Sequence, residues 1–204
     1  MGCGTALPSL ALFQWQLAQN RDSSELSLGL ADYNPSVLQL VTVPNILLTW
    51  AQLRSGSSWE PEGELDIDEE LLHAFSAGLE QRNITLSFYS GAWSPEFVHL
   101  VTSTSRSRKE ALDAPLLILG AETIYSPVAL KSFTESLMTI LHLQDNSEAM
   151  ALVAAKKVYF GVGGSIEDFC DALRARRGKV EQIREEVDGV RRAVMEIKKG
   201  ESRP

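Results

Sequence analysis

Short apolar runs alternate along this chain with longer segments in which apolar residues recur every three or four positions. The first pattern is typical of strands, and the second is typical of helices with one buried face. Their alternation favours an α/β fold with a mostly parallel sheet covered by helices. The run at 114–119 is nearly continuous in apolar residues, as expected for a strand buried on both faces. The predicted strands span residues 26–31, 84–89, 114–119, 150–154, 180–186 and 190–198.

Helices are predicted after the first glycines, over 7–13, and twice between the first two strands. Pro35 suits the first turn of one helix, and Pro44 should kink it, because proline lacks an N–H and crowds the preceding turn. The apolar positions expected to face inward in this helix are Val37, Leu38, Leu40 and Val41. The next helix is expected to present one apolar face made of Leu71, Leu72, Phe75 and Leu79.

Two later helices carry clear start signals. Ser126 and Pro127 suit the N-cap and the first helical position. The inward stripe of that helix is predicted to be Leu130, Phe133, Leu137 and Leu141. Ser165, followed by Asp168, predicts a second capped start for a helix that continues through Arg177.

The composition suits one domain over residues 1–204, with 44% apolar residues and a net charge of −8. Because nonspecific nucleic-acid binding draws on clustered positive charge, we expect none. No apolar run is expected to cross a membrane. The two cysteines and three histidines are too scattered to predict a metal site. We expect a cytoplasmic protein, with the nucleus left open, and the oligomeric state is not predicted.

Two polar stretches are predicted to lie outside the packed core. Residues 54–68 are turn-rich and acidic, which predicts a mobile loop. Residues 103–109 form a basic cluster, which is either a solvated loop or a weak contact with a partner.

The candidate chemistry begins at Gly2-Cys3-Gly4, just before the first predicted helix. Two close glycines let a backbone approach a ligand, although an ordinary tight turn is the alternative. Asp32 ends the first predicted strand, where a carboxylate can accept hydrogen bonds from a ribose. A dinucleotide fingerprint fits poorly, because Ala6 stands in place of the third glycine and the acid comes later than the usual interval of about 20 residues.

Five segments, in this order, resemble the eukaryotic protein-histidine N-methyltransferases: residues 32–34, 41–45, 90–94, 122–127 and 159–164. The resemblance covers the chain from Gly2 to about Lys199. It implies a doubly wound, Rossmann-like methyltransferase sheet, mostly parallel, with an antiparallel C-terminal hairpin. It also implies S-adenosylmethionine as the cofactor and a ring nitrogen of a protein histidine as the acceptor. In known members the substrate is a large-subunit ribosomal protein.

Members of this family carry a first strand and an acidic residue before the glycine loop, and neither is found here ahead of Gly2. In the doubly wound order that strand lies between the strands that end at Asp32 and Glu122. Without it, we expect two strands with unpaired edges, at a cost of about 1 to 3 kcal/mol for each unpaired buried group. The sequence therefore predicts an N-terminally shortened domain that folds poorly.

In an open α/β sheet the ligand lies in the crevice at the carboxyl ends of the strands. We therefore assign Gly2, Cys3 and Gly4 to backbone contact with the cofactor, and Asp32, Tyr33 and Asn34 to its ribose. Ala92 and Trp93 are assigned to the adenine, which the resemblance favours. A tryptophan packed in the core is the alternative for Trp93.

The reacting centre is assigned to Glu122 and Tyr125. A histidine with a pKa of about 6.5 is largely neutral near pH 7, so its methylation needs no strong base. A carboxylate at Glu122 can orient the ring and stabilise its developing charge, and Tyr125 can support the same ring. Alternatively, Glu122 caps a neighbouring backbone amide. The resemblance also implies that Tyr159, Phe160 and Gly161 shape the substrate entrance.

Two other functions stay open at this point. Related seven-strand enzymes methylate lysine, so a protein-lysine methyltransferase would use the same cofactor residues. A chain without the first strand is, as a third possibility, an inactive fragment or a binding module.

Overall fold

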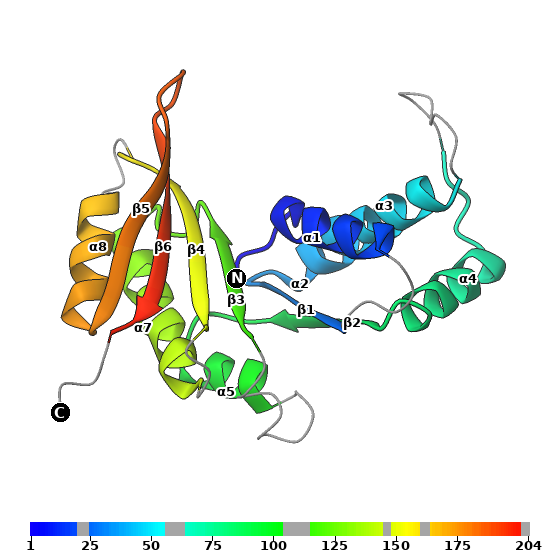
Figure 1. Ribbon diagram of the computed structural model, residues 1–204, viewed down its shortest axis with the longest axis horizontal. Coiled ribbons are helices and arrows are strands. Elements are labelled where there is room, and N and C mark those ends of the chain that lie inside the picture. The colour runs from blue at the N-terminus through cyan, green and yellow to red at the C-terminus, as the bar shows by residue number, and fades with distance from the viewer. Residues whose placement is uncertain (20–24, 56–63, 104–114, 145–147, 160–163, 201–204) are drawn as a thin grey trace. The chain divides into compact units, whose positions relative to one another are not determined.

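The structure is a computed structural model that describes residues 1–19, 25–55, 64–103, 115–144, 148–159 and 164–200 (Figure 1). The chain divides into two compact units. Unit 1 comprises Met1–Gly2 and Gly91–Pro204, and unit 2 comprises Cys3–Ser90. Each unit is described by itself.

Unit 2 holds a parallel pair of strands, β1 and β2, that run in register from Leu26 opposite Ile84 to Asp32 opposite Ser90. Its elements are α1 (Leu7–Ala18), β1 (Leu26–Asp32), α2 (Pro35–Val37), the π-helix η1 (Leu38–Thr42), α3 (Val43–Ser55), α4 (Glu69–Glu80) and β2 (Ile84–Ser90). Its core contains Phe13, Leu30, Ile46, Trp50 and Ile84, all buried.

The helix that begins at Pro35 is disturbed before Pro44, as predicted, but the disturbance is a π turn. The Val43 N–H donates to the Leu38 carbonyl, which is five residues earlier, because the Pro44 ring crowds the regular turn. The extra residue rotates the following side chains. Thr42 is therefore fully buried, whereas Leu40 is 74% exposed, so the prediction that Leu40 faces inward is wrong.

The run Pro35–Arg54 spans 20 residues with a mean hydropathy of 1.3, which is long and apolar enough to cross a membrane. The sequence-based expectation that no run reaches this length is therefore wrong. Its buried side chains, however, pack in the core of unit 2, and a core helix of a folded domain passes the same test. They include Ile46, Leu47, Trp50 and Ala51.

Helix α4 begins at an Asp68 cap, whose carboxylate accepts from the Leu71 N–H at 2.8 Å. Leu71, Phe75 and Leu79 pack against the core of unit 2. Leu72 is 46% exposed, so its assignment to the inward face is wrong. The three packed residues repeat every fourth position, and Leu72 lies about 100° around the helix from that stripe.

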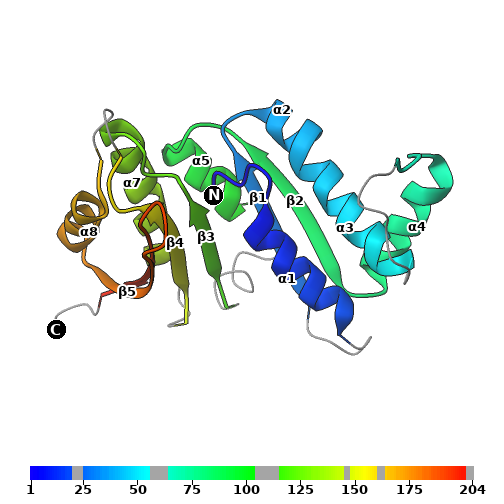
Figure 2. The same ribbon diagram turned by 90° about the horizontal axis from the view of Figure 1, so that it is seen from above.

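Unit 1 is built on a four-stranded sheet in the order β3-β4-β6-β5. Strands β3 and β4 are parallel, and β6 is antiparallel to both β4 and β5. Helices α7 and α8 lie along one face of this sheet (Figures 1 and 2). The elements are α5 (Pro95–Ser103), β3 (Leu117–Ala121), α7 (Pro127–Leu143), β4 (Met150–Lys156), α8 (Ile166–Ala175), β5 (Gly178–Glu186) and β6 (Arg192–Lys199).

The capped helices of unit 1 begin where the sequence predicts. The Ser126 hydroxyl accepts from the Ala129 N–H at 3.2 Å, and the inward stripe Leu130, Phe133, Leu137 and Leu141 is buried. The Ser165 hydroxyl accepts from the Asp168 N–H at 3.0 Å and donates to the Asp168 carboxylate at 2.9 Å. Helix α8 ends at Ala175, two residues before the predicted end.

The α/β character and the antiparallel C-terminal hairpin are confirmed. The hydrogen-bonded strands form two sheets, however, and among the described strands β1 pairs only with β2 and β3 only with β4. The continuous doubly wound sheet stays a prediction. Burial alternates along β3, with Ile118 buried and Leu117 41% exposed, so only one face of this strand is fully covered and the prediction of burial on both faces is wrong.

Replacing Ser165 by alanine should lower the free energy of unfolding of unit 1 by about 1 kcal/mol, because the first turn of α8 loses its cap. Asp171→Ala, in the same helix, breaks an exposed pair with Arg174 and should cost about 0.5 kcal/mol or less. Urea unfolding measures both values. Equal losses would contradict the capping role of Ser165.

Candidate functional site

Cys3 and Gly4 of the glycine loop are fixed to the carboxyl end of β1 in unit 2. The Cys3 N–H donates to the Ala31 carbonyl at 2.9 Å, and the Gly4 N–H donates to Oδ2 of Asp32 at 2.9 Å. The Thr42 hydroxyl donates to the Gly4 carbonyl at 2.7 Å. The predicted proximity of Gly4 and Asp32 is therefore confirmed.

Asp32 also organises the turn that follows β1. Its Oδ1 accepts from the Asn34 N–H at 3.1 Å, and the Asn34 side chain in turn accepts from the Ser36 N–H at 2.9 Å. A carboxylate has about four acceptor positions, so these two bonds leave capacity for a ligand. Tyr33 between them is 75% exposed. The ribose role of Asp32 stays a prediction beside its structural role.

Gly2 and Trp93 meet in unit 1. Gly2 has a φ of +65°, and a Cβ there would lie 3.1 Å from the Thr123 side chain and 3.5 Å from Trp93. The Trp93 ring packs edge-on against Phe133, with centroids 5.0 Å apart. Its contact with the core is the alternative considered for this residue, and its adenine role stays a prediction. Ala92 beside it is exposed.

Glu122 follows β3, and its N–H donates to the Ala154 carbonyl of β4 at 2.9 Å. Its φ of +55° is uncommon for a residue with a side chain. Oε2 accepts from the Tyr159 hydroxyl at 3.0 Å, and Oε1 accepts from Nε of Arg192 at 3.2 Å. Segments that follow β3 and β4 and the start of β6 thus meet at one carboxylate, which we call the Glu122 cluster, made of Glu122, Tyr159 and Arg192.

The Tyr159 hydroxyl is held from two sides, since it also accepts from the Lys156 N–H at 3.3 Å. Burial, followed by the hydrogen bond to Glu122, raises the pKa of Tyr159 to about 12. Tyr159 therefore stays a neutral donor near pH 7. Tyr159 was predicted to line the substrate entrance, and its hydroxyl donates to the proposed reacting carboxylate.

The remaining predicted site residues are less constrained. Tyr125 is 52% exposed, and Phe160 and Gly161 lie outside the described residues. Gly164 has a φ of +107°, and a Cβ there would lie 2.8 Å from the Ile124 carbonyl. Glycine therefore lets the chain after β4 approach the turn after Glu122. In the described part of the chain, no group of three or more His, Cys, Asp or Glu side chains is placed to hold a metal ion.

Arg192 was not found by sequence reasoning. It is the first residue of β6, opposite Lys156 of β4, and it lies 70 positions after Glu122. No local motif marks it, because its partner is reached only through the pairing of β4 with β6.

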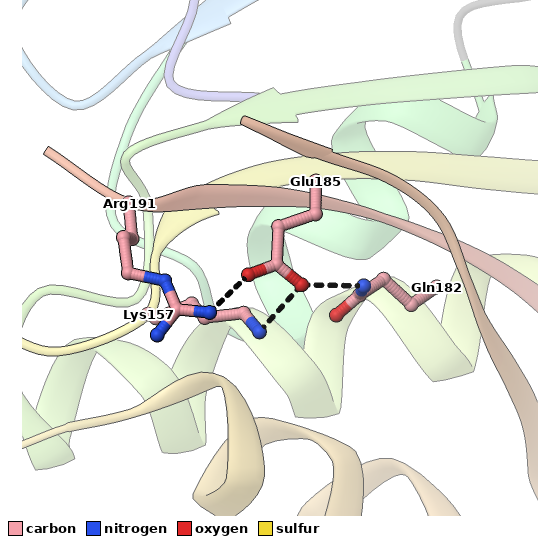
Figure 3. A network of polar contacts seen from close by, with 4 residues as sticks. All are labelled: Lys157, Gln182, Glu185 and Arg191. Atoms are coloured by element: carbon pink, nitrogen blue, oxygen red, sulfur yellow. Dashed lines mark hydrogen bonds and ion pairs between the residues drawn. The ribbon is translucent and has the colours of Figure 1, made fainter. Parts of the chain in front are cut away.

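A polar network beside this cluster lies where β5 ends and β6 begins (Figure 3). Glu185 of β5 accepts from Lys157 at 2.7 Å, from Arg191 at 2.7 Å and from Gln182 at 3.1 Å. These hydrogen bonds, with that of Lys157 first, lower the pKa of Glu185 to about 2. Lys157 and Arg191 directly follow β4 and precede β6, so the network orders the segments that carry Tyr159 and Arg192.

The chain is similar to curated proteins named histidine protein methyltransferase 1. It is 38% identical over 182 residues to the protein of Saccharomyces cerevisiae, a match that covers 83% of this chain and 47% of the relative. Identity to the Schizosaccharomyces pombe protein is 37% over 175 residues, covering 85% and 48%. A homologue from Rattus norvegicus is 28% identical over 97% of this chain and 48% of its own length.

This chain is a homologue of part of the histidine protein methyltransferases. The resemblance identified in the sequence is thereby confirmed. The chain spans about half the length of the curated relatives it matches. No family model matches. The crystal structure of PH0226 protein from Pyrococcus horikoshii OT3 aligns with 9% identity and a TM-score of 0.31, covering 97% of this chain and 89% of that one, too low a score to support an argument.

The Glu185 network should stabilise unit 1 in a pH-dependent way. The pKa of Glu185 is lowered on folding, so its contribution is fully present above the unfolded value of about 4.5 and is lost as the pH falls through about 2. The difference in unfolding free energy between wild type and Glu185→Gln should shrink over that window in urea titrations.

Glu186→Gln is the matched control, because Glu186 makes one long, exposed pair with Arg184 at 3.4 Å. Its difference from wild type should stay small throughout. Carboxyl carbon NMR measures the Glu185 pKa directly, and a value near 4.5 would contradict the network.

Proposed function

We propose that this chain supports methyl transfer from S-adenosylmethionine to a ring nitrogen of a protein histidine. The names of the homologues support the reaction class. The Glu122 cluster is the observation that supports a reacting centre at particular residues. It presents an oriented carboxylate at the carboxyl end of a parallel strand, where α/β enzymes bind their ligands.

One observation in unit 2 supports binding of the cofactor's ribose. The Asp32 carboxylate accepts from the Gly4 and Asn34 amides and still has acceptor positions for ribose hydroxyls. We propose that Asp32 holds the ribose, followed by Tyr33 and Asn34. The backbone of the glycine loop is proposed to contact the amino-acid part, and Ala92 and Trp93 are proposed to contact the adenine. When bound, S-adenosylmethionine supplies an electrophilic methyl group on a sulfonium.

A neutral imidazole already exposes one nitrogen lone pair, so the site needs to fix the ring rather than deprotonate it. Glu122 is proposed to accept a hydrogen bond from the other ring nitrogen, which sets the tautomer. The same carboxylate stabilises the positive charge that develops on the ring. Tyr125 is proposed to pack against the substrate, since its ring is half exposed.

A histidine acceptor suits this cluster better than a lysine. An amine with a pKa of about 10.4 must lose a proton before it can attack. Tyr159, whose pKa is about 12, is a neutral donor and not a base at pH 7. By the resemblance, we propose a large-subunit ribosomal protein as the substrate.

Mass spectrometry of peptides from a ribosomal fraction treated with the protein and S-adenosylmethionine tests the reaction. We expect one additional methyl group on a histidine. Methylation of a lysine instead would show that the protein is a lysine methyltransferase. If no residue is methylated and the cofactor does not bind, the proposal is contradicted.

Glu122→Gln should lower kcat by roughly a hundred-fold, because a neutral amide no longer offsets charge on the ring. Tyr125→Phe should lower it less. Both should bind S-adenosylhomocysteine nearly as wild type does by calorimetry. Normal turnover in both variants would show that the reacting centre lies elsewhere.

Asp32→Asn should weaken S-adenosylhomocysteine binding by about ten-fold or more, because a bidentate acceptor for the ribose is lost. Asp68→Asn is the matched control, since Asp68 also accepts from a backbone N–H in unit 2 but caps α4. Equal affinities of the two variants would contradict the ribose assignment.

A further inference from the structure

The two oxygens of Glu122 are held by contacts of different kinds. Oε2 accepts from the Tyr159 hydroxyl, and Oε1 accepts from the Arg192 guanidinium. Tyr159 packs its ring against the core of unit 1, whereas the Arg192 side chain is 48% exposed. The Tyr159 contact is therefore held by packing in the core, whereas the Arg192 contact is made by a side chain that is half exposed to solvent.

The anchored contact has further support. The Tyr159 hydroxyl also accepts from the Lys156 N–H, so donor and acceptor positions of the phenol are both used. The Lys156 ammonium lies 5.8 Å from the ring centroid. A ring fixed by packing, with its hydroxyl bonded on two sides, has little freedom to release Oε2.

The exposed contact is easily exchanged. The pair of Arg192 and Glu122 has exposed fractions of 48% and 41%, and pairs this exposed contribute little to stability. Arg192 differs from the other arginines of the hairpin in the segment that its side chain reaches. Arg184 and Arg191 pair with carboxylates of β5, while Arg192 reaches the segment that follows β3.

The group that Arg192 places on Oε1 resembles the proposed substrate. Nε–H of arginine is a planar N–H donor in a delocalised system, as is the N–H of an imidazole or imidazolium ring. Both groups donate in the plane of their own π-system. Oε1 is thus already shown, by a side chain of this chain, to accept this class of donor.

We propose that Tyr159 is a positioning residue that holds Oε2 of Glu122, and that the ring N–H of the substrate histidine displaces Arg192 from Oε1. This inference rests on the proposed function. The two hydrogen bonds to Glu122 have similar lengths, but we assign them different roles. Tyr159 keeps the carboxylate in place during the reaction, and Arg192 occupies Oε1 until the substrate replaces it.

The roles predict opposite kinetic effects. Tyr159→Phe should lower kcat by about ten-fold and leave KM for a histidine peptide nearly unchanged, because the carboxylate loses its fixed orientation. Arg192→Met should lower KM several-fold with kcat retained within about two-fold, because the substrate no longer competes with an internal donor. Arg192→Lys keeps a charged donor and should restore most of the wild-type KM.

Arg184→Met is the matched control, since Arg184 lies on the same hairpin, is 73% exposed and pairs only locally in the described contacts. Its kinetics should match wild type. Melting temperatures of all variants show whether any loss is one of folding. If Arg192→Met lowers kcat as much as Tyr159→Phe does, both residues position Glu122 and the separation of roles is overturned.

A second readout does not depend on methyl transfer. Tyrosine ionisation, measured by ultraviolet difference titration against Tyr159→Phe, should place Tyr159 near pH 12, and Glu122→Gln should move it toward 10. Among the described residues, the charged groups that face the phenol are Glu122, Arg192 and Lys156. An unchanged titration in Glu122→Gln would overturn the hydrogen bond itself, whereas a normal shift with no methylated product would contradict only the proposed function.

Discussion

The hydrogen bonds that meet at Glu122 are the constraint on which the candidate site depends. A side chain at a left-handed position carries a cost that glycine would avoid, so this backbone conformation persists only where surrounding contacts stabilise it. The bond from the Glu122 N–H to the Ala154 carbonyl and the bond from the Tyr159 hydroxyl to Oε2 provide those contacts, from segments that the pairing of β3 with β4 brings together. The pairing of the strands therefore determines where the Glu122 carboxylate lies, and that carboxylate is the proposed reacting group at this end of the sheet.

Unit 2 uses a similar arrangement for a different purpose. Asp32 also ends a parallel strand, and its oxygens accept from the Gly4 and Asn34 amides, which orders both the glycine loop and the turn before α2. Backbone amides are fixed donors, so Asp32 shapes a loop, whereas the side-chain donors on Glu122 leave one oxygen open to exchange. The donors bound to each carboxylate thus distinguish Asp32, which orders a loop, from Glu122, which keeps one exchangeable contact.

Features that depend on neighbouring residues could be predicted from the sequence. The Ser126 and Ser165 caps, the stripe of α7 and the strand that ends at Asp32 rest on spacings within a few positions. Leu40 was misplaced because the π turn before Pro44 shifts the helical period, which a regular 3.6-residue pattern does not include. Arg192 could not be found, because it meets Glu122 only through the pairing of two distant strands.

A crystal structure of the protein bound to S-adenosylhomocysteine and a histidine-containing peptide measures the central claim most directly. We predict that one ring nitrogen of the peptide histidine lies about 2.6 to 3.2 Å from Oε1 of Glu122. Tyr159 should remain on Oε2, and the guanidinium of Arg192 should have moved away. A histidine ring bound elsewhere, with the Arg192 contact intact, would contradict the assignment of Glu122 as the reacting carboxylate.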